Sequence, residues 1–385
     1  MTHYKEIQQQ HEFNVYPKRD IQIIKGKNAL VWDEQGKEYI DCVAGHGVAN
    51  IGHCNENIVL AIEAQARKLI TVSNTFYNDV RALIMQKLIS ISPKNLSRVF
   101  LCNSGTETIE AAIKFSRFST KKKNFICANR AFHGRTLGSL SATYQNNYKQ
   151  DFEPLLPGFD FVPYNKFDKL IEKVSDKTAA IILEVVQGEG GVHIGTREYF
   201  EQVRTLCDEK DILLIIDEVQ TGFCRTGKMF ACEHFDIQPD ILCLAKGIAG
   251  GLPMGAVLCS DKVEQPMGKH GSTFGGNPLV CAAAIAAIDF MIEEKLDEQA
   301  AAKGKYLSEH LNRLNLSKIR QIRQLGLMIG IELKEKVKPH LIKLMELRVL
   351  SLPAGSTVLR LLPPLTIGYQ ELDLVVKRIA KVLRA

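Results

Sequence analysis

The sequence predicts an α/β fold in which helices flank a mostly parallel sheet, with a smaller α+β domain at the C-terminus. Short apolar runs at 213–217 and 241–244 have the length and composition of parallel strands buried on both faces. A segment with apolar residues at helical spacing, 196–209, precedes them. At 385 residues the chain is too long for one simple core, so we expect two domains that share a large sheet.

Each of these two runs leads into one ionisable residue, Asp217 or Lys246. Because ligands bind beyond the carboxyl ends of strands in open α/β sheets, the two side chains should meet at one sheet edge, although 29 residues separate them. A buried lysine can form a Schiff base with an aldehyde, and a carboxylate can pair with a protonated pyridine nitrogen. The pair therefore suggests a pyridoxal phosphate site, while a structural ion pair explains these two residues equally well.

The net charge and the hydropathy of the chain argue against a nucleic-acid-binding protein and against a membrane-spanning protein. The 49 basic and 43 acidic residues leave a net charge of +6, without a basic stripe interleaved with aromatic residues, so nucleic acid is not an expected partner. This positive charge would favour association with an acidic partner through electrostatic steering. The alternative is that the basic residues form an ordinary solvated surface. No membrane segment is expected, because no stretch approaches the ~18–20 apolar residues that cross a bilayer, and the N-terminus has no apolar signal region.

The ten cysteines show neither Cys-x-x-Cys nor Cys/His pairs at zinc spacing, so we expect no metal site. Several lie inside apolar runs, for example Cys243 and Cys259, and are interpreted as small core residues. Unpaired core cysteines are typical of a reducing compartment, which predicts a cytoplasmic protein.

The chain divides into three predicted parts. Residues 1–50 form an N-terminal segment with a small β-meander at 21–43, whose apolar runs are separated by glycine-containing turns. A glycine-containing loop at 44–50 follows and carries His46. The large domain spans 51–290. Its helical patterns are 57–70, 80–91, 104–118, 196–209 and 279–294, and its strand patterns are 98–102, 125–128, 180–185, 213–217, 241–244 and 256–260.

The segment Asn-Ser-Gly-Thr-Glu follows the strand at 98–102. Ser104 and Glu107 have the S-x-x-E spacing of a capping box that opens a helix. A strand, a turn at Gly105 and a helix N-terminus together offer free backbone N–H groups and the positive end of the helix dipole to an anion. A phosphate suits such a site, although an ordinary capped helix has the same pattern.

Two other strand ends carry candidate residues. Phe132 and Arg135 both follow the predicted strand 125–128. The phenyl ring of Phe132 could cover a flat cofactor, and the guanidinium of Arg135 could bind a carboxylate in bidentate fashion. The strand at 180–185 holds Glu184 and leads into a glycine-rich turn.

Residues 291–385 form the predicted C-terminal α+β domain, with strands at 327–333 and 358–362 and a helix at 370–384. Arg360 lies inside the second of these strands. A buried unpaired arginine is costly, so Arg360 requires an anionic partner, either a protein carboxylate or a substrate.

Six motifs, taken together and in order, resemble the class III pyridoxal-phosphate aminotransferases of fold type I, in the acetylornithine/ornithine aminotransferase subgroup. The resemblance runs from about residue 12 to the C-terminus. It implies a mostly parallel seven-stranded sheet in the large domain. The motifs are Asn-Ser-Gly-Thr-Glu (103–107), Phe-His-Gly-Arg-Thr (132–136), Gln-Gly-Glu-Gly-Gly (187–191), Asp-Glu-Val-Gln-Thr-Gly (217–222), Ala-Lys-Gly (245–247) and Thr-Phe-Gly-Gly-Asn-Pro (273–278).

The resemblance implies a cofactor, pyridoxal 5′-phosphate, and a role for each matching position. Lys246 would form the Schiff base and move the proton, Asp217 would bind the pyridinium nitrogen, and Glu184 would support the site. Thr273 would reach the phosphate of the neighbouring subunit, which makes the active unit a homodimer with shared sites. The remaining cofactor contacts would be made by Gln220 (phenolic oxygen), Phe132 and Val219 (ring faces), and Ser104, Gly105 and Thr106 (phosphate).

The resemblance also implies how substrates bind. Arg360 would take the α-carboxylate of glutamate, and Arg135 the distal carboxylate. Glu189 would cover Arg360 whenever an ω-amine occupies the site. The reaction is then an amino-group exchange between glutamate/2-oxoglutarate and an ω-amine.

Within the subgroup, segments 41–53, 318–336 and 354–360 are similar to transaminases of carrier-protein-dependent lysine and arginine biosynthesis, which act on lysine or ornithine linked to a small acidic carrier protein. His46, a substrate-binding candidate, stands where these enzymes tend to have tyrosine. N-acetylornithine aminotransferase is the alternative function. A 4-aminobutyrate-type aminotransferase and a non-catalytic protein of this fold are the remaining possibilities.

Overall fold

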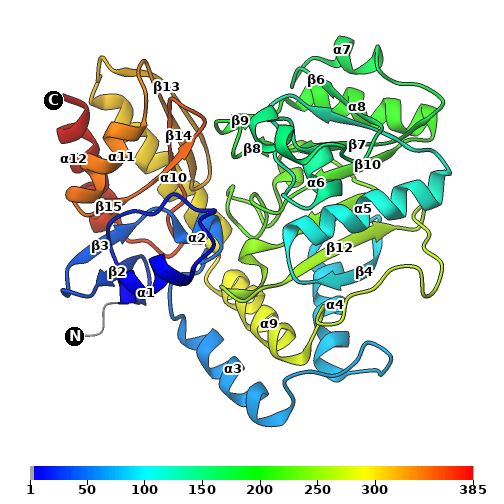
Figure 1. Ribbon diagram of the computed structural model, residues 1–385, viewed down its shortest axis with the longest axis horizontal. Helices are drawn as coiled ribbons and strands as arrows, with labels where there is room; N and C mark the ends of the chain where they lie inside the picture. The colour runs from blue at the N-terminus through cyan, green and yellow to red at the C-terminus, as the bar shows by residue number, and fades with distance from the viewer. Residues whose placement is uncertain (1–3, 385) are drawn as a thin grey trace.

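The computed structural model describes residues 4–384, and its central sheet has seven mostly parallel strands, as expected (Figure 1). The strand order is β4-β12-β11-β10-β7-β5-β6, and β12 alone runs antiparallel to its neighbours β4 and β11. The strands are β4 (Leu96–Cys102), β5 (Asn124–Ala128), β6 (Phe159–Val162), β7 (Thr178–Glu184), β10 (Leu213–Asp217), β11 (Ile241–Leu244) and β12 (Gly255–Ser260).

Alternate residues of the central strands face two separate helical layers, which explains the continuous apolar runs. In β10, Leu213 and Ile215 pack in one apolar cluster with α5 (Gly105–Thr120), whereas Leu214 and Ile216 pack in another with α8 (Arg197–Lys210). β10 is thus buried on both faces, as is typical of central parallel strands.

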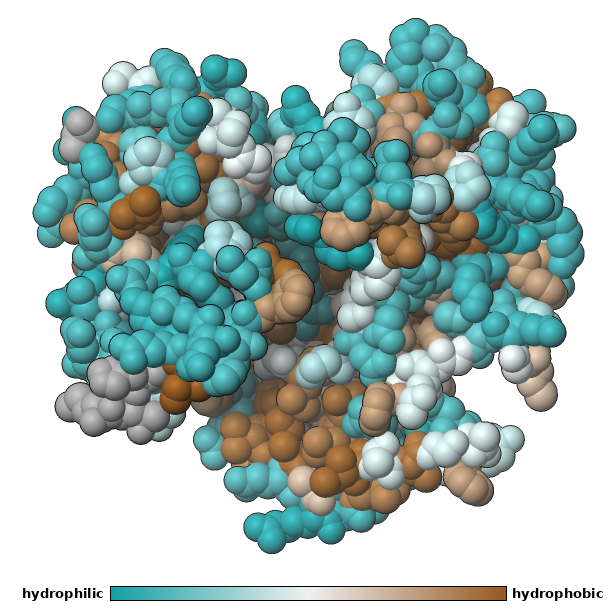
Figure 2. Space-filling view, in the orientation of Figure 1, coloured by the Kyte–Doolittle hydropathy of each residue, from teal (hydrophilic) through white to brown (hydrophobic). Residues whose placement is uncertain are grey.

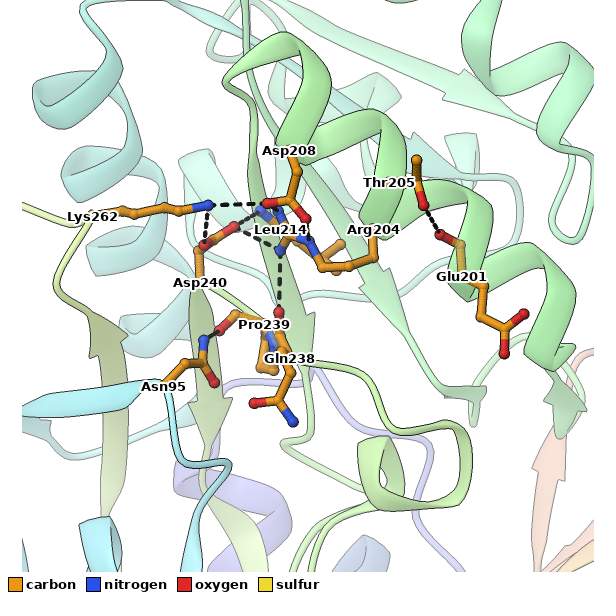
Figure 3. A network of polar contacts seen from close by, with 10 residues as sticks. All are labelled: Asn95, Glu201, Arg204, Thr205, Asp208, Leu214, Gln238, Pro239, Asp240 and Lys262. Carbon is orange, nitrogen blue, oxygen red and sulfur yellow. Dashed lines mark hydrogen bonds and ion pairs between the residues drawn. The ribbon is translucent and has the colours of Figure 1, made fainter.

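A polar network holds the amino-terminal ends of β10 and β11 in register (Figure 3). Buried Asp240, just before β11, accepts a hydrogen bond from the backbone N of Leu214 at 2.8 Å and pairs with Arg204 of α8 at 2.9 Å. Lys262 and Arg204 also bind Asp208. Because one carboxylate bridges both strands, the positions of the residues that follow the strands are fixed as well.

Two smaller sheets lie beside each other to one side of the large sheet (Figure 1). The predicted meander is present, and a strand from the C-terminal region, β15, joins it parallel to β3. Its strands are β1 (Ile23–Lys27), β2 (Leu30–Asp33), β3 (Glu38–Asp41) and β15 (Val349–Leu350). The antiparallel C-terminal sheet has the order β13-β14-β17-β16, with β13 (Ile319–Leu325), β14 (Met328–Leu333), β16 (Leu352–Ala354) and β17 (Val358–Leu361). A two-stranded hairpin consists of β8 (Val186–Gln187) and β9 (His193–Ile194).

The division into 1–50, 51–290 and 291–385 stays a prediction, and its outermost residues 1–3 and 385 lie outside the described part. The other helices are α1 (Tyr4–His11), α2 (Ala44–Gly47), α3 (Glu56–Lys68), α4 (Asp79–Ile91), α6 (Leu137–Ala142), α7 (Phe167–Ile171), α9 (Pro278–Glu293), α10 (Leu296–Arg313), α11 (Lys338–Glu346) and α12 (Tyr369–Arg384). Short 3₁₀ turns are η1 (Asn146–Tyr148), η2 (Gln150–Phe152), η3 (Ala231–Phe235) and η4 (Lys246–Ala249).

Some local features differ from the expectations, and elements such as β6 and α10 were not predicted. The expected loop at 44–50 contains the helical turn α2, in which His46 has a positive φ of 63°. Strand β13, Ile-Arg-Gln-Ile-Arg-Gln-Leu, was not predicted, because it is only partly buried and lacks a strict alternation of apolar residues.

Between residues 4 and 384 no helix combines the length and apolarity needed to span a bilayer. The same residues contain no group of three or more His, Cys, Asp or Glu placed to hold a metal ion.

Candidate active site

A pocket of about 780 Å³ opens at the carboxyl edge of the central sheet. Its walls come from segments that follow β4, β5, β7, β10 and β11, as expected for a ligand site in an open α/β sheet. Ten of the thirteen predicted site residues line it: Ser104, Gly105, Thr106, Phe132, Arg135, Glu189, Asp217, Val219, Gln220 and Lys246. Arg360, His46 and Thr273 do not.

Lys246 follows β11 and has a positive φ of 45°, in the left-handed region that few non-glycine residues adopt. Among the described residues its ammonium group has no hydrogen-bond or ion-pair partner. Desolvation lowers the pKa of Lys246, although the charge of Glu189 opposes this effect. An unpaired lysine that loses its proton more readily is suited to act as a nucleophile and a base.

Asp217 ends β10, and both of its carboxylate oxygens are held. Oδ1 accepts a hydrogen bond from the backbone N of Val219 at 3.0 Å, and Oδ2 lies 2.7 Å from Nδ1 of His133. Burial disfavours the charged ring, but the hydrogen bond and charge of Asp217 raise the pKa of His133. Sequence reasoning missed His133, although it stands beside Phe132 after β5.

Glu184, at the end of β7, supports the same region. Its Oε2 accepts a hydrogen bond from the backbone N of Phe132 at 3.2 Å. Burial raises the pKa of Glu184 to about 8, so its carboxyl group favours the protonated form. The contact fixes the turn from which the Phe132 ring reaches the pocket.

The N-terminus of α5 lies at the pocket, where the sequence predicts an anion site. Ser104 Oγ accepts a hydrogen bond from the backbone N of Glu107, but the Glu107 carboxylate binds the backbone N of Asn103 at 2.9 Å, one residue earlier than a capping box requires. Within the described chain, the N–H groups of Gly105 and Thr106 donate to no protein acceptor. A Cβ at Gly105 would lie 2.6 Å from Cγ1 of Val219, so only glycine lets the two segments meet.

The anionic partner that buried Arg360 requires is Glu189. Nη2 of Arg360 lies 2.6 Å from Oε1 of Glu189, and Nη1 donates to Oε1 of Gln220 at 3.1 Å. Arg360 is fully buried, while Glu189 stays partly exposed. Burial works against ionisation of Glu189, but the charge of Arg360 lowers the pKa of its carboxyl group.

The three remaining candidates lie nearer the surface. Arg135 is exposed on the pocket wall, with its guanidinium over the ring of Tyr148. His46 is exposed too, yet partial desolvation and the nearby charge of Arg360 lower the pKa of its ring. Thr273 is exposed on the turn before α9, outside the pocket of its own chain.

The family model for aminotransferase class-III matches residues 14–383. The chain belongs to the class-III aminotransferases. It is 47% identical over 382 residues to the LysW-aminoadipate semialdehyde transaminase of Deinococcus radiodurans, which covers 98% of this chain and 89% of that relative. It is 43% identical over 385 residues to the acetylornithine aminotransferase of Methanopyrus kandleri, with 99% of both chains covered.

Among solved structures, the ornithine aminotransferase of Toxoplasma gondii ME49 superposes with a TM-score of 0.95 at 33% identity, covering 99% of this chain and 94% of that chain. The protein is therefore a fold type I aminotransferase, as the six motifs predicted. Class-III aminotransferases use pyridoxal phosphate. The pocket fits this cofactor: it offers an unpaired lysine, a carboxylate held on both oxygens, and a glycine cradle with unused N–H donors.

Proposed function

We propose that this aminotransferase exchanges an amino group between glutamate/2-oxoglutarate and a carrier-protein-linked semialdehyde, forming carrier-linked lysine and/or ornithine in lysine and/or arginine biosynthesis. The observation that carries the ω-amine assignment is the 2.6 Å ion pair between Arg360 and Glu189. A fully buried arginine needs a negative partner in every state of the reaction, because an unpaired buried charge is strongly destabilising.

The two half-reactions supply that partner in different ways. Glutamate brings an α-carboxylate to Arg360, so Glu189 has to move aside. Its neighbours Gly188, Gly190 and Gly191 give this turn the backbone freedom to do so. An ω-amine brings no carboxylate to Arg360, and Glu189 then remains paired. One pocket can in this way accept both donors.

The other residues of the pocket have separate roles in cofactor binding and proton transfer. Bound pyridoxal phosphate supplies the aldehyde that receives the amino group and a ring that withdraws electrons. Lys246 Nζ would hold the cofactor, and as a base it would take the proton from the substrate carbon that bears the nitrogen and pass it to the cofactor side of the site. Asp217, held by His133, would place a negative charge beside the ring nitrogen. Phe132 and Val219 would pack against the two faces of the ring.

Sequence similarity and charge support the carrier-linked substrate. The 47% identity to a LysW-aminoadipate semialdehyde transaminase exceeds the 43% to the acetylornithine aminotransferase of M. kandleri. A net charge of +6 suits an acidic carrier protein, because complementary charge increases the rate of encounter. The second candidate, N-acetylornithine, is supported by several relatives named acetylornithine aminotransferase that are 41–45% identical.

The active unit in this proposal is a homodimer with shared active sites. Figure 2 shows a hydrophobic area over the region where α3 and α9 lie in Figure 1. Large apolar side chains on nearby segments are exposed, among them Ile70, Phe76, Tyr77 and Phe274. A second copy of the chain would cover them and bring Thr273 to the neighbouring cofactor phosphate.

The test is a comparison of kcat/KM for carrier-linked lysine, carrier-linked ornithine and free N-acetylornithine, each at low and high salt. The proposal predicts a strong preference for the carrier forms that weakens as salt screens the charges. Efficient turnover of N-acetylornithine, without carrier preference or salt dependence, would instead assign the enzyme to the acetylornithine reaction.

A further inference from the structure

Tyr148 lies outside the pocket lining, yet it contacts a residue of the pocket wall. The guanidinium carbon of Arg135 lies over the Tyr148 ring, 3.9 Å from its centroid, and 5.5 Å from the centroid of the Phe132 ring. The two aromatic rings meet edge to face, with centroids 6.0 Å apart. The three side chains form one cluster that joins the expected cofactor-facing ring to the expected carboxylate-binding arginine.

The backbone fixes this cluster to the strand end that carries the site. The N–H of Tyr144 donates to the carbonyl of Ala131 at 2.9 Å, which ties the start of the Tyr148 segment to the residues just before Phe132. The N–H of Tyr148 donates to the carbonyl of Gln145 at 3.1 Å and closes the 3₁₀ turn η1. Arg135 and Tyr148 thus lie on either side of α6, and the Tyr144–Ala131 hydrogen bond joins the two sides.

Stacking matters here because the described residues hold the guanidinium by contacts with aromatic rings, the nearest of which is Tyr148. In the described chain, Arg135 has no hydrogen-bond or ion-pair partner, and its side chain is exposed. A free arginine side chain loses considerable rotamer entropy when it binds a ligand, whereas a stacked one has already lost part of it. With its flat face on the ring, the guanidinium keeps its N–H edges available for bidentate binding of a carboxylate.

We propose that Tyr148 is a positioning residue that sets the affinity for substrates with a carboxylate at the pocket mouth, by holding the guanidinium of Arg135 ready for it. The inference rests on the proposed function. When the ω-amine reacts at Lys246, the α-carboxylate at the other end of the lysine or ornithine unit would reach Arg135, as the distal carboxylate of glutamate would. The inference extends that function to Tyr148, a residue outside the pocket lining.

The experiment is a double-mutant cycle on the holoenzyme with Arg135→Ala, Tyr148→Leu and the pair. Tyr148→Leu removes the ring but keeps an apolar side chain against Phe132, and Tyr148→Phe keeps the ring. We expect Tyr148→Leu to raise KM about two- to fivefold with kcat little changed, and Tyr148→Phe to behave as wild type. In the Arg135→Ala background, Tyr148→Leu should have no further effect on KM.

Tyr144→Leu is the matched control, because Tyr144 lies on the same segment but packs against Phe161 instead. An unchanged KM for Tyr148→Leu, or a KM effect that persists in full without Arg135, would overturn the proposal. The cycle is measured with both the carrier-linked substrate and N-acetylornithine, so that the test of Tyr148 is independent of the test of the substrate. If the enzyme shows no preference for the carrier-linked substrate, the proposed function is wrong, but the coupling between Tyr148 and Arg135 should still be observed.

Discussion

His133 and Asp217 form a buried pair at the carboxyl edge of the sheet, with Nδ1 of the histidine 2.7 Å from Oδ2 of the aspartate. His133 follows β5 and Asp217 ends β10, and β7 lies between these two strands in the sheet. The contact therefore links segments that are distant in sequence, and it orients the carboxylate that is expected to meet the cofactor's ring nitrogen.

His133→Ala should weaken cofactor binding. A hydrogen bond to a charged group contributes about 1.5–3 kcal/mol, so we expect the dissociation constant of pyridoxal phosphate to rise about 10- to 100-fold. Absorbance titration of the cofactor-free protein measures it. His310→Ala is the control, because the hydrogen bond and the ring contact that His310 makes are both with Tyr306, within α10. Unchanged cofactor affinity in His133→Ala would show that Asp217 needs no such partner.

Glu184→Gln should change how stability depends on pH. Burial raises the pKa of Glu184 from 4.5 to about 8, so the folded state keeps a proton that the unfolded chain releases. Stability must then fall as pH rises from about 5 to about 8 and level off above that range. His133, whose pKa is also raised, adds to the fall above its unfolded pKa of 6.5.

The glutamine variant removes the Glu184 contribution and should flatten this curve in urea unfolding of the holoenzyme. Exposed Glu201→Gln serves as the control, since its side chain lies on the surface of α8. A curve for Glu184→Gln that is as steep as that of wild type would contradict the assignment.

Glu189→Ala should impair the two half-reactions unequally. With an ω-amine in the pocket, buried Arg360 would lose its 2.6 Å partner, whereas glutamate brings its own carboxylate. We expect kcat/KM for the ω-amino donor to fall about 10- to 100-fold and that for glutamate to change little. Stopped-flow absorbance of each half-reaction measures both. Glu189→Gln, of equal size but uncharged, should behave similarly, and equal losses in both half-reactions would contradict the switch.

Gly105→Ala should disturb the cradle by overpacking. The added methyl group would lie 2.6 Å from Cγ1 of Val219, and such contacts in a packed site cost about 1–3 kcal/mol. Thermal unfolding of the holoenzyme should show a lower Tm together with weaker cofactor binding. Adding Val219→Ala makes room for the methyl group and should recover part of the loss. If the double variant loses as much as the sum of the single variants, the clash is not the cause.

Mixing two impaired variants tests whether each active site combines Lys246 of one subunit with Thr273 of the other. In a dimer of Lys246→Ala with Thr273→Arg, one site combines the intact lysine of one subunit with the intact threonine of the other. We expect this mixture to regain activity after subunit exchange, while each parent alone stays impaired. If Thr273 serves its own chain, every site in the mixed dimer carries one lesion and no activity returns.

Much of the fold could be predicted from the sequence because its causes are local. The run 213–217 indicates a strand since both faces of β10 are covered, and the spacing of apolar residues in 196–209 reflects one buried face of α8. Strand β13 escaped prediction because its partial burial imposes no clear alternation. The family resemblance of the motifs implied ten residues that line the pocket. Their motifs come together there because the carboxyl ends of parallel strands meet at one edge of the sheet.

Local sequence patterns are enough to identify the reactive groups of this protein: a lysine and an aspartate at strand ends, a glycine at the start of a helix, and a buried arginine that requires a counter-charge. The contacts among these groups follow from the tertiary fold. His133 meets Asp217 across 84 positions of chain, and Tyr148 meets Arg135 across 13. The family resemblance implied the pairing of Glu189 with Arg360, and the fold brings these residues together across 171 positions. Such contacts depend on the packing of whole elements against one another, and no local pattern of residues encodes them.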